Sequence, residues 1–302
     1  MKKISLLVLI SCLFIVVFSC DKKVKNQEET IIKGKATILV DETLLPVIED
    51  QKEVFENQYN ASITLVGKSE SEIVQLLSKN KQQLAILSRE LTESEAEIFK
   101  TKKITPRITT LATDAIAFIS HKNNSDTIID LEKVITFVQG KNQNDFKGLV
   151  FDNPNSSTVR YIKELAKINV LPKEKIFSFQ TNNEVIHFVA KNEGMIGVVG
   201  VNWLSQPSPA MRETIKIVKV LSVKSLKTAT FVKPSQDHIA SGLYPLTREV
   251  KMLNYQPFPG LGMGFASFVA GEIGQRIILK SGLVPAKIPN RNIILRKEIN
   301  KK

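Results

Sequence analysis

The sequence predicts an α/β protein of two lobes, each a doubly wound sheet flanked by helices. Short runs rich in Val, Ile and Leu alternate with segments of helical periodicity, as in the strand–helix units of a parallel sheet. Two longer apolar segments, residues 110–120 and 244–255, are predicted to run beside each other as crossovers between the lobes. They enclose a second series of such units, which predicts a second lobe inserted into the first. A chain of 302 residues is long enough to build both hydrophobic cores.

The first lobe begins with three strand–helix units in series. Strands are expected at residues 37–40, 62–66 and 84–88. A helix at residues 43–59 follows the first strand. Capping boxes, in which Ser or Thr is followed three residues later by Glu, open the next two helices at Ser69 and Thr92. These units predict residues 37–115 as the first part of lobe 1.

The inserted segment, residues 116–246, is predicted as lobe 2 because it has a strand–helix series of its own. Its expected elements, in order, are strand 148–151, helix 157–168, strand 176–179, helix 183–191 and strand 194–201. Residues 247–302 then return to lobe 1. They carry a last helix, expected at residues 264–281. The glycine-rich residues 260–264 are expected to form the loop that leads into this helix.

The N-terminus has the pattern of a secretory signal. A basic start is followed by an apolar run at residues 4–18, which as a helix would span about 22 Å and so fall short of a bilayer core of about 30 Å. Cys20 follows Val17-Phe18-Ser19, which resembles the lipobox of bacterial lipoproteins. Residues 1–19 are therefore predicted as a signal peptide, Cys20 as a lipidated residue, and residues 20–36 as a tether. The alternative is an uncleaved membrane anchor.

The composition argues against several function classes. The net charge is +12, but the lysines are scattered and no basic helix is interleaved with aromatic residues, so nucleic acid is not an expected partner. The histidines lack metal-ligand spacing or a neighbouring nucleophile, and no phosphate-binding glycine loop of the nucleotide-hydrolase type occurs. We therefore expect no enzyme activity, metal or cofactor.

Hydroxyl-bearing residues stand where predicted strands meet helices. These junctions lie at Thr43, Ser69, Ser88-Arg89 and residues 156–158. Ligands of open α/β sheets bind at such junctions, and free N–H groups at helix starts attract anions. The helix after residue 156 also carries basic residues and no acid in its first turns, which suits a bound anion. The alternative is that these residues are ordinary helix caps with solvated neighbours.

The order of several motifs resembles the phosphate-binding proteins of bacterial phosphate ABC transporters, in a divergent lipoprotein branch. The motifs are Asp41-Glu42-Thr43-Leu44-Leu45-Pro46, Leu87 to Thr92, Phe151 to Thr158, Gly194 to Gly200, Tyr244-Pro245-Leu246-Thr247, and Gly271 to Pro285. This resemblance implies a two-lobed fold of the type II periplasmic-binding-protein kind. Together with the junctions, it implies a ligand site formed by Thr43, Leu44, Ser69, Ser88, Arg89, Ser156, Ser157 and Thr158.

Two positions depart from the pattern of this family. Arg89 stands where the family has an aspartate, and the arginine that precedes the family's Ser-Gly-Thr has no counterpart between Phe151 and Asn155. We hypothesise that Arg89 supplies the missing positive charge.

The function implied is that of a monomeric lipoprotein, periplasmic or on the cell surface. It would capture a small oxyanion, with phosphate favoured, for the permease of an ABC transporter. A first alternative is an envelope scaffold that has the same fold and has lost or altered ligand binding. A second, ranked far behind, is an enzyme that acts on a phosphorylated or carboxylated substrate.

Overall fold

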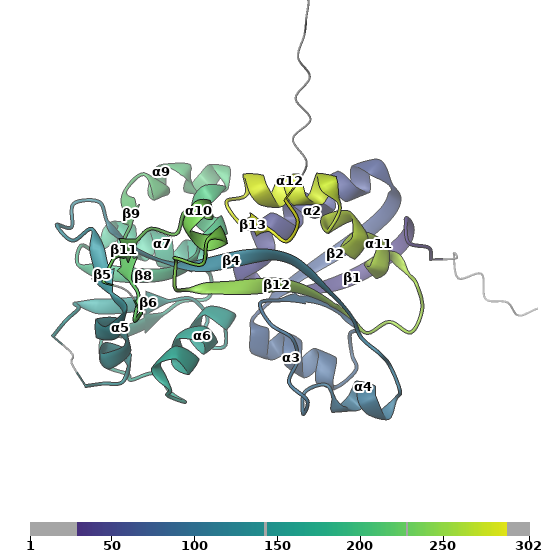
Figure 1. The fold of residues 1–302 in the computed structure, drawn as a ribbon, viewed down its shortest axis with the longest axis horizontal. Coiled ribbons are helices and arrows are strands. Elements are labelled where there is room, and N and C mark those ends of the chain that lie inside the picture. Colours follow the sequence, from purple (N-terminus) through teal and green to yellow (C-terminus); the bar gives the residue numbers. More distant parts are fainter. Residues whose placement is uncertain (1–28, 142–143, 228, 289–302) are drawn as a thin grey trace, which may run out of the picture.

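A mixed sheet runs through the whole molecule in the computed structural model, which describes residues 29–141, 144–227 and 229–288 (Figure 1). Its strands are β1 (Lys33–Asp41), β2 (Asn60–Lys68), β3 (Leu84–Leu87), β4 (Arg107–His121), β6 (Gly148–Phe151), β7 (Ile176–Ser178), β8 (Met195–Gly200), β9 (Val218–Val220), β12 (Thr247–Asn254) and β13 (Val284–Pro285). They are ordered β2-β1-β3-β12-β4-β8-β6-β7, with β9 and β13 also paired to β4. The predicted α/β fold is confirmed.

The long strand β4 joins the two halves of the sheet. From Arg107 to Ala115 it pairs antiparallel with β12, and from Ile116 to Ser120 it pairs with β8. The two apolar segments that the sequence predicted as crossovers thus run side by side. We call the half with β1, β2, β3 and β12 lobe 1, and the half with β6, β7 and β8 lobe 2.

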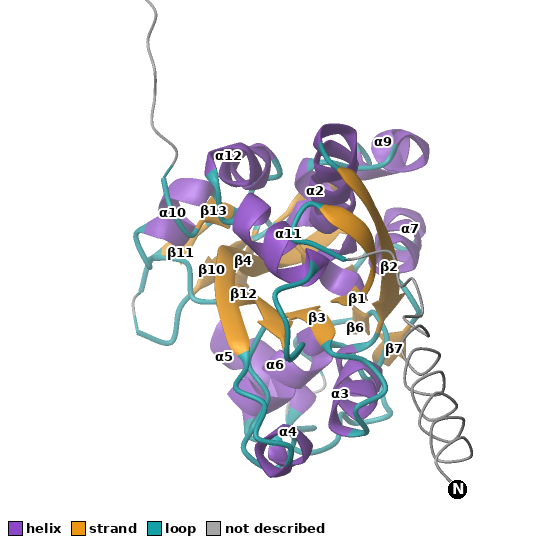
Figure 2. Cartoon of the chain, turned by 90° about the vertical axis from the view of Figure 1, so that its right-hand side faces the viewer, coloured by secondary structure: helices purple, strands orange, loops and turns teal. Residues whose placement is uncertain are grey.

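Helices cover both faces of the sheet in lobe 1, as Figure 2 shows. They are η1 (Glu42–Leu44), α2 (Leu45–Gln58), α3 (Glu70–Ser78), α4 (Glu97–Thr101), α11 (Leu261–Val269) and α12 (Glu272–Lys280). On one face Ile38 and Val40 pack with Phe55 and Phe265 of α2 and α11. On the other face Leu39 packs with residues of α3 and α4. Alternate residues of β1 therefore feed two cores, as a doubly wound sheet requires.

Lobe 2 repeats this arrangement. Its helices are α5 (Leu131–Val138), α6 (Ser157–Ala166), α7 (Asn182–Lys191), α8 (Asn202–Ser205), η2 (Pro209–Met211), α9 (Arg212–Ile215) and α10 (Gln236–Ala240), and a small sheet contains β5 (Ile128–Asp130), β10 (Ser222–Lys224) and β11 (Phe231–Val232). Phe118, Phe151 and Ile162 share one core, whereas Val150 and Val185 lie in a second core on the opposite face.

The end of lobe 1 corrects one prediction. The single helix expected at residues 264–281 is two helices, α11 and α12, because Gly271 has an extended backbone and caps α12. Gly274 allows α12 to pack on the end of α11, since a Cβ there would lie 2.5 Å from the carbonyl oxygen of Phe268. Residues 260–264 are also not a loop, because α11 begins at Leu261.

Two capping boxes were predicted, and both sets of contacts form. Ser69 and Glu72 cap each other at the start of α3, as expected. Thr92 and Glu95 also exchange hydrogen bonds with each other's backbone N–H, at 2.8 and 3.3 Å. The helix that follows, however, begins only at Glu97 and is short. The second box therefore caps a turn rather than a long helix.

The predicted signal peptide and Cys20 lie outside the described residues. Among the residues that the structure describes, none of the helices combines the length and apolar character needed to span a membrane.

Candidate anion-binding site

The site lies where strands of the two lobes end opposite each other. Strand β1 ends at Asp41, and η1 and α2 follow it; strand β6 ends at Phe151, and α6 follows it. Local sequence shapes both junctions. The Asp41 carboxylate accepts a hydrogen bond from the Thr43 N–H at 3.1 Å, and the Ser156 hydroxyl accepts one from the Val159 N–H at 3.2 Å. Both helix starts are thereby fixed.

Thr43 of lobe 1 and Ser157 of lobe 2 meet across the interface. Their hydroxyl oxygens are 3.2 Å apart, and both residues are fully buried. The guanidinium of Arg248 donates to both of them, from Nη1 to the Ser157 hydroxyl at 2.7 Å and from Nη2 to the Thr43 hydroxyl at 3.1 Å. A permanent positive charge therefore stands between two hydroxyls from opposite lobes.

Arg248 is positioned by the pairing of β4 and β12. It lies directly opposite Asp114 in the register of these strands, and its Nε donates to the Asp114 carboxylate at 2.9 Å. Only 5% of Arg248 is exposed, so this ion pair is buried. Nη2 also lies 2.8 Å from the same Asp114 oxygen, so it is shared between Asp114 and the Thr43 hydroxyl, whereas Nη1 donates to the Ser157 hydroxyl.

Asn182 links two carboxyl groups from opposite lobes. Its side-chain nitrogen donates to Glu42 of lobe 1 at 2.9 Å and to Asp152 of lobe 2 at 3.2 Å. Burial, reinforced by the neighbouring Asp152 charge, raises the pKa of Glu42 to about 8. Burial raises the pKa of Asp152 to about 7, although a hydrogen bond from the Ser156 hydroxyl opposes the shift. These two carboxyls therefore titrate near neutral pH.

Asp41 adds a third buried carboxyl next to Arg248. Burial raises its pKa above the ordinary value, and the charge of Arg248 opposes the rise. Because Arg248 contributes a fixed charge while Asp41, Glu42 and Asp152 all resist ionisation, the net charge of the site depends on pH. Protonation of these carboxyls leaves the site more positive.

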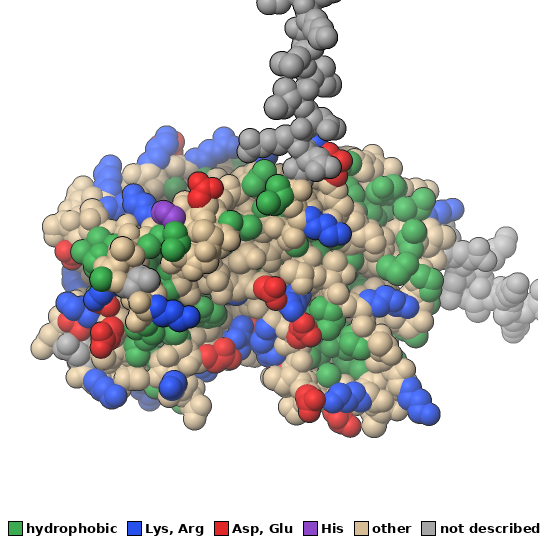
Figure 3. Space-filling view, in the orientation of Figure 1, with side chains coloured by type: hydrophobic (Ala, Val, Ile, Leu, Met, Phe, Trp, Pro, Cys, Tyr) green, Lys and Arg blue, Asp and Glu red, His purple; other side chains and the backbone are tan. Residues whose placement is uncertain are grey.

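A second set of charges closes the interface on the side of α3 and α6. The carboxylate of Glu70 binds Arg89 of lobe 1 at 3.0 Å and Arg160 of lobe 2 at 2.6 Å. These residues, with Ser156, line a groove of about 210 Å³. Figure 3 shows this face of the molecule hollowed between the lobes, with charged side chains on the walls.

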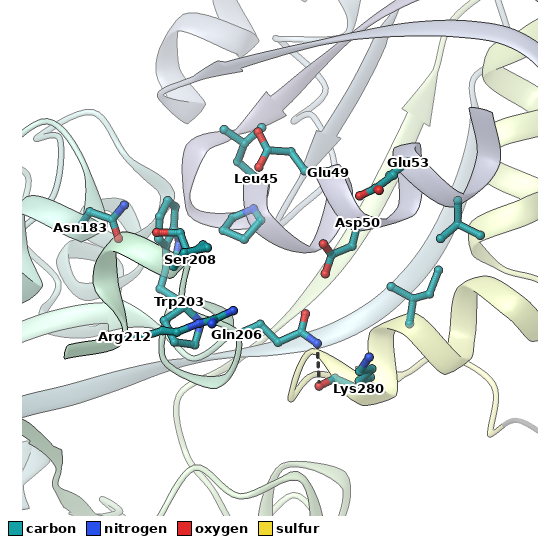
Figure 4. Close-up of a pocket in the computed structure, with 15 residues that line it drawn as sticks. Leu45, Glu49, Asp50, Glu53, Asn183, Trp203, Gln206, Ser208, Arg212 and Lys280 are labelled. Atoms are coloured by element: carbon teal, nitrogen blue, oxygen red, sulfur yellow. Dashed lines mark hydrogen bonds between the residues drawn. The ribbon is translucent and has the colours of Figure 1, made fainter. Parts of the chain in front are cut away.

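A larger groove of about 860 Å³ lies on another side of the interface, between α2 and the segment around α8 and α9 (Figure 4). Acidic residues of α2, including Glu49 and Glu53, face Trp203 and Arg212 across it. Trp203 connects this groove to the site, since its indole N–H donates to the carbonyl oxygen of Thr43 at 3.0 Å.

Comparison with known proteins identifies the family of this two-lobed chain. The family model described as the PBP superfamily domain matches residues 25–272. The chain belongs to the PBP superfamily. No curated protein matches the chain by sequence. Membership of the periplasmic-binding-protein superfamily and the type II fold, both implied by the sequence resemblance, are confirmed.

Solved structures of PBP-type proteins share the fold at low sequence identity. A phosphate ABC transporter substrate-binding protein with bound phosphate from Clostridium perfringens has 20% identity and a TM-score of 0.69, over 84% of this chain and 100% of that one. An ABC-type phosphate transport receptor from Vibrio cholerae has 19% identity and a TM-score of 0.63, over 83% and 100% of the two chains.

The PBP fold brings some of the predicted site residues together. Thr43 and Ser157 touch, and Ser156 and Thr158 flank Ser157 at the start of α6. The Thr158 hydroxyl is buried and has no hydrogen-bond partner among the described residues. Leu44 is buried in the core of lobe 1. Which of these residues contact a ligand stays a prediction.

Other predicted residues have partners elsewhere in this PBP chain. Ser69 donates to Glu72 at 2.8 Å, and Ser88 accepts from Arg160 at 3.2 Å. The hydrogen bonds of Arg89 go to Glu70, Glu95 and the carbonyl oxygen of Glu90, and none goes to Thr43 or Ser157. The guanidinium between the two hydroxyls belongs to Arg248, not to Arg89.

Sequence reasoning missed Arg248, although a signal was present. Arg248 directly follows the motif of residues 244–247, in a segment predicted to run beside residues 110–120. An arginine in one apolar crossover and Asp114 in the other are typical of a buried ion pair, because unpaired charges are rarely buried.

Proposed function

We propose that this PBP-superfamily chain is an extracytoplasmic solute-binding lipoprotein that captures a small oxyanion, phosphate, and presents it to the permease of an ABC transporter. The observation that carries this proposal is the position of Arg248, which donates to hydroxyls of both lobes at once. An oxyanion placed there would accept bonds from the same three side chains, and so would favour closure of the lobes.

Further features of the site support an anionic ligand. The start of α6 offers N–H groups and the unpartnered hydroxyl of Thr158. Glu42 and Asp152, with pKa values of about 8 and 7, can bind protons near neutral pH and so reduce repulsion of an anion. A protonated carboxyl can also donate a hydrogen bond to an oxyanion.

The relatives support the ligand and the partner. The similar structure from Clostridium perfringens holds phosphate, and the one from Vibrio cholerae is a transport receptor. We propose binding without turnover, because Arg248 engages the hydroxyls of Thr43 and Ser157. The Ser156 hydroxyl, which donates to the Asp152 carboxyl, is occupied as a helix cap, since it also accepts from the Val159 N–H. The lipid on Cys20 would hold the receptor at a membrane.

A scaffold without ligand binding is the second candidate, and specific contacts favour it. The Thr43 N–H, which an anion would use, donates to the carboxylate of Asp41. Asp152 stands in the segment where the resemblance implies an arginine, so this part of the site carries an acid in place of a base. Both features reduce the number of donors left for an anion.

Calorimetric titration of the mature chain tests the proposal. Phosphate, arsenate and sulfate are titrated at a mildly acidic pH into the wild type and into Arg248→Gln, with Arg212→Gln as a control on lobe 2. We expect phosphate to bind the wild type and the control, and to bind Arg248→Gln weakly. Absence of binding by every anion would favour the scaffold. In a separate assay with phosphate esters, release of product would favour an enzyme.

A further inference from the structure

The first described residues are held against lobe 1. The carboxylate of Glu29 accepts a hydrogen bond from the Leu261 N–H at 2.7 Å and so satisfies a free donor at the start of α11. The backbone of Ile31 lies directly on Gly264, where a Cβ would come within 1.6 Å of the Ile31 carbonyl oxygen. Only glycine permits this approach. We call residues 29–32 the arm, and its position on α11 is fixed by these contacts.

Exposed apolar side chains gather beside the arm. Ile31, Ile32 and Phe258 are 43%, 49% and 42% exposed, and Pro257 and Pro259 are exposed as well. The Phe258 ring and the Glu29 carboxylate both lie within 3 Å of the position that a Cβ on Gly260 would take, so the loop and the arm are neighbours. Figure 3 shows this apolar area at the right-hand end of the molecule. We call these five residues the arm surface.

Basic residues lie next to the arm in the sequence and beside the proline-rich loop. Lys33 and Lys35 follow the arm and are exposed, and Arg107 is exposed and donates to the Gln256 carbonyl oxygen beside the proline-rich loop. Exposed aliphatic and aromatic side chains with a basic border are typical of surfaces that rest in the interface of an anionic bilayer. An isolated exposed Ile or Phe would need no explanation, but a cluster of them marks an interaction surface.

The chain that precedes the arm limits what can cover this surface. From Cys20 to Glu29 the backbone spans at most about 30 Å. A lipid on Cys20 would therefore keep the arm surface close to the bilayer, whereas lobe 2 lies at the far end of the long axis of the molecule (Figure 1). We propose that the arm surface lies on the membrane that carries the protein's own lipid; this inference rests on the proposed lipoprotein function. The groove lined by Glu70, Arg89 and Arg160 then opens sideways, along the membrane plane.

Quenching of a label by the membrane tests this orientation independently of natural lipidation. In this experiment the mature chain carries an N-terminal histidine tag in place of Cys20, and the tag binds nickel-chelating lipid in vesicles. The vesicles consist of phosphatidylethanolamine and phosphatidylglycerol, and they contain lipids whose headgroups quench fluorescence. A fluorophore is attached to Ser267→Cys on α11 or to Val170→Cys on lobe 2, both at exposed positions. We expect several-fold stronger quenching at residue 267 than at residue 170.

Matched variants show whether the arm surface causes the difference. The difference in quenching should be mostly removed by a triple variant of the arm surface, Ile31→Ser with Ile32→Ser and Phe258→Ser. A control triple variant changes similar exposed side chains of lobe 2, Leu226→Ser with Phe231→Ser and Leu243→Ser, and should leave the difference intact. Equal quenching at both labels in the wild type, or no effect of the first set, would overturn the proposal. Lipidation of Cys20 is measured separately by mass spectrometry, so its absence would contradict the proposed function and not this orientation.

Discussion

Arg248 and Ser157 are joined across the lobe interface by a 2.7 Å hydrogen bond, although they lie on elements of different lobes and are 91 residues apart. The same guanidinium is held by Asp114 and reaches Thr43. The positive charge at the interface is thus fixed by the strands that connect the lobes, so the proposed anion binding would be coupled to lobe closure.

The first prediction compares the two arginines. Arg248→Gln should weaken phosphate binding about 10- to 100-fold, because a charge-assisted hydrogen bond contributes about 1.5–3 kcal/mol. Arg89→Gln should have a smaller effect, since Arg89 binds Glu70 and Glu95. Calorimetric titration of both variants decides this. A larger loss in Arg89→Gln would restore the assignment made from the sequence.

Arg248 should also matter for stability. Its removal leaves the fully buried carboxylate of Asp114 without its cation, and breaking such a pair costs about 3–5 kcal/mol. Replacing both partners, as in Arg248→Met with Asp114→Leu, should recover much of this loss. Urea denaturation of the single and double variants provides the measurement, and additive losses would contradict the buried pair.

A pH dependence follows from Glu42 and Asp152. Their pKa values of about 8 and 7 exceed the ordinary values near 4, so between about pH 4 and 8 the folded protein keeps protons that the unfolded chain has lost. The free energy of unfolding should therefore fall as the pH rises through this range. Glu42→Gln, which resembles the protonated acid, should melt several degrees above the wild type at pH 8 and close to it at pH 5.

The control for this effect is Glu174→Gln, a change at an exposed loop position of lobe 2. It should leave the slope of melting temperature against pH unaltered. If Glu42→Gln has the same slope as the wild type, the carboxyl is ionised throughout and the shared contact with Asn182 has been misjudged.

The ion pair between the lobes should influence how far they open. Glu70→Gln removes the carboxylate that binds Arg89 and Arg160, and leaves two like charges near each other. We expect a larger radius of gyration by small-angle scattering in buffer without added anion. Glu95→Gln removes an ion pair with Arg89 that lies entirely within lobe 1, and it should not expand the molecule. Equal values for all three proteins would show that Glu70 does not hold the lobes.

Lipidation is predicted for Cys20. Mass spectrometry of the mature N-terminus should show an acylated cysteine, and Cys20→Ala should release the protein from membranes, because an anchor of several acyl chains binds stably. A mature protein that keeps residues 1–19, or a Cys20→Ala variant that stays membrane-bound, would contradict this.

The sequence by itself determined the class of fold, because periodicity and helix caps are local signals. The strands expected at residues 148–151 and 194–201 correspond to β6 and β8, and the Ser69 capping box opens α3. The rule that ligands bind beyond strand ends also selected Thr43 and Ser157, which are 114 residues apart and touch in the structure.

Only the tertiary structure decided which charges meet between the lobes. Arg248 lies beside Asp114 because of the register of β4 and β12, and Glu42 lies near Asp152 because Asn182 of α7 binds both. Likewise, Gly271 and Gly274 divide the last helix in two through the packing of α12 on α11. These contacts join segments far apart in the chain or depend on close packing, and neither is encoded in the local pattern from which strands and helices are predicted.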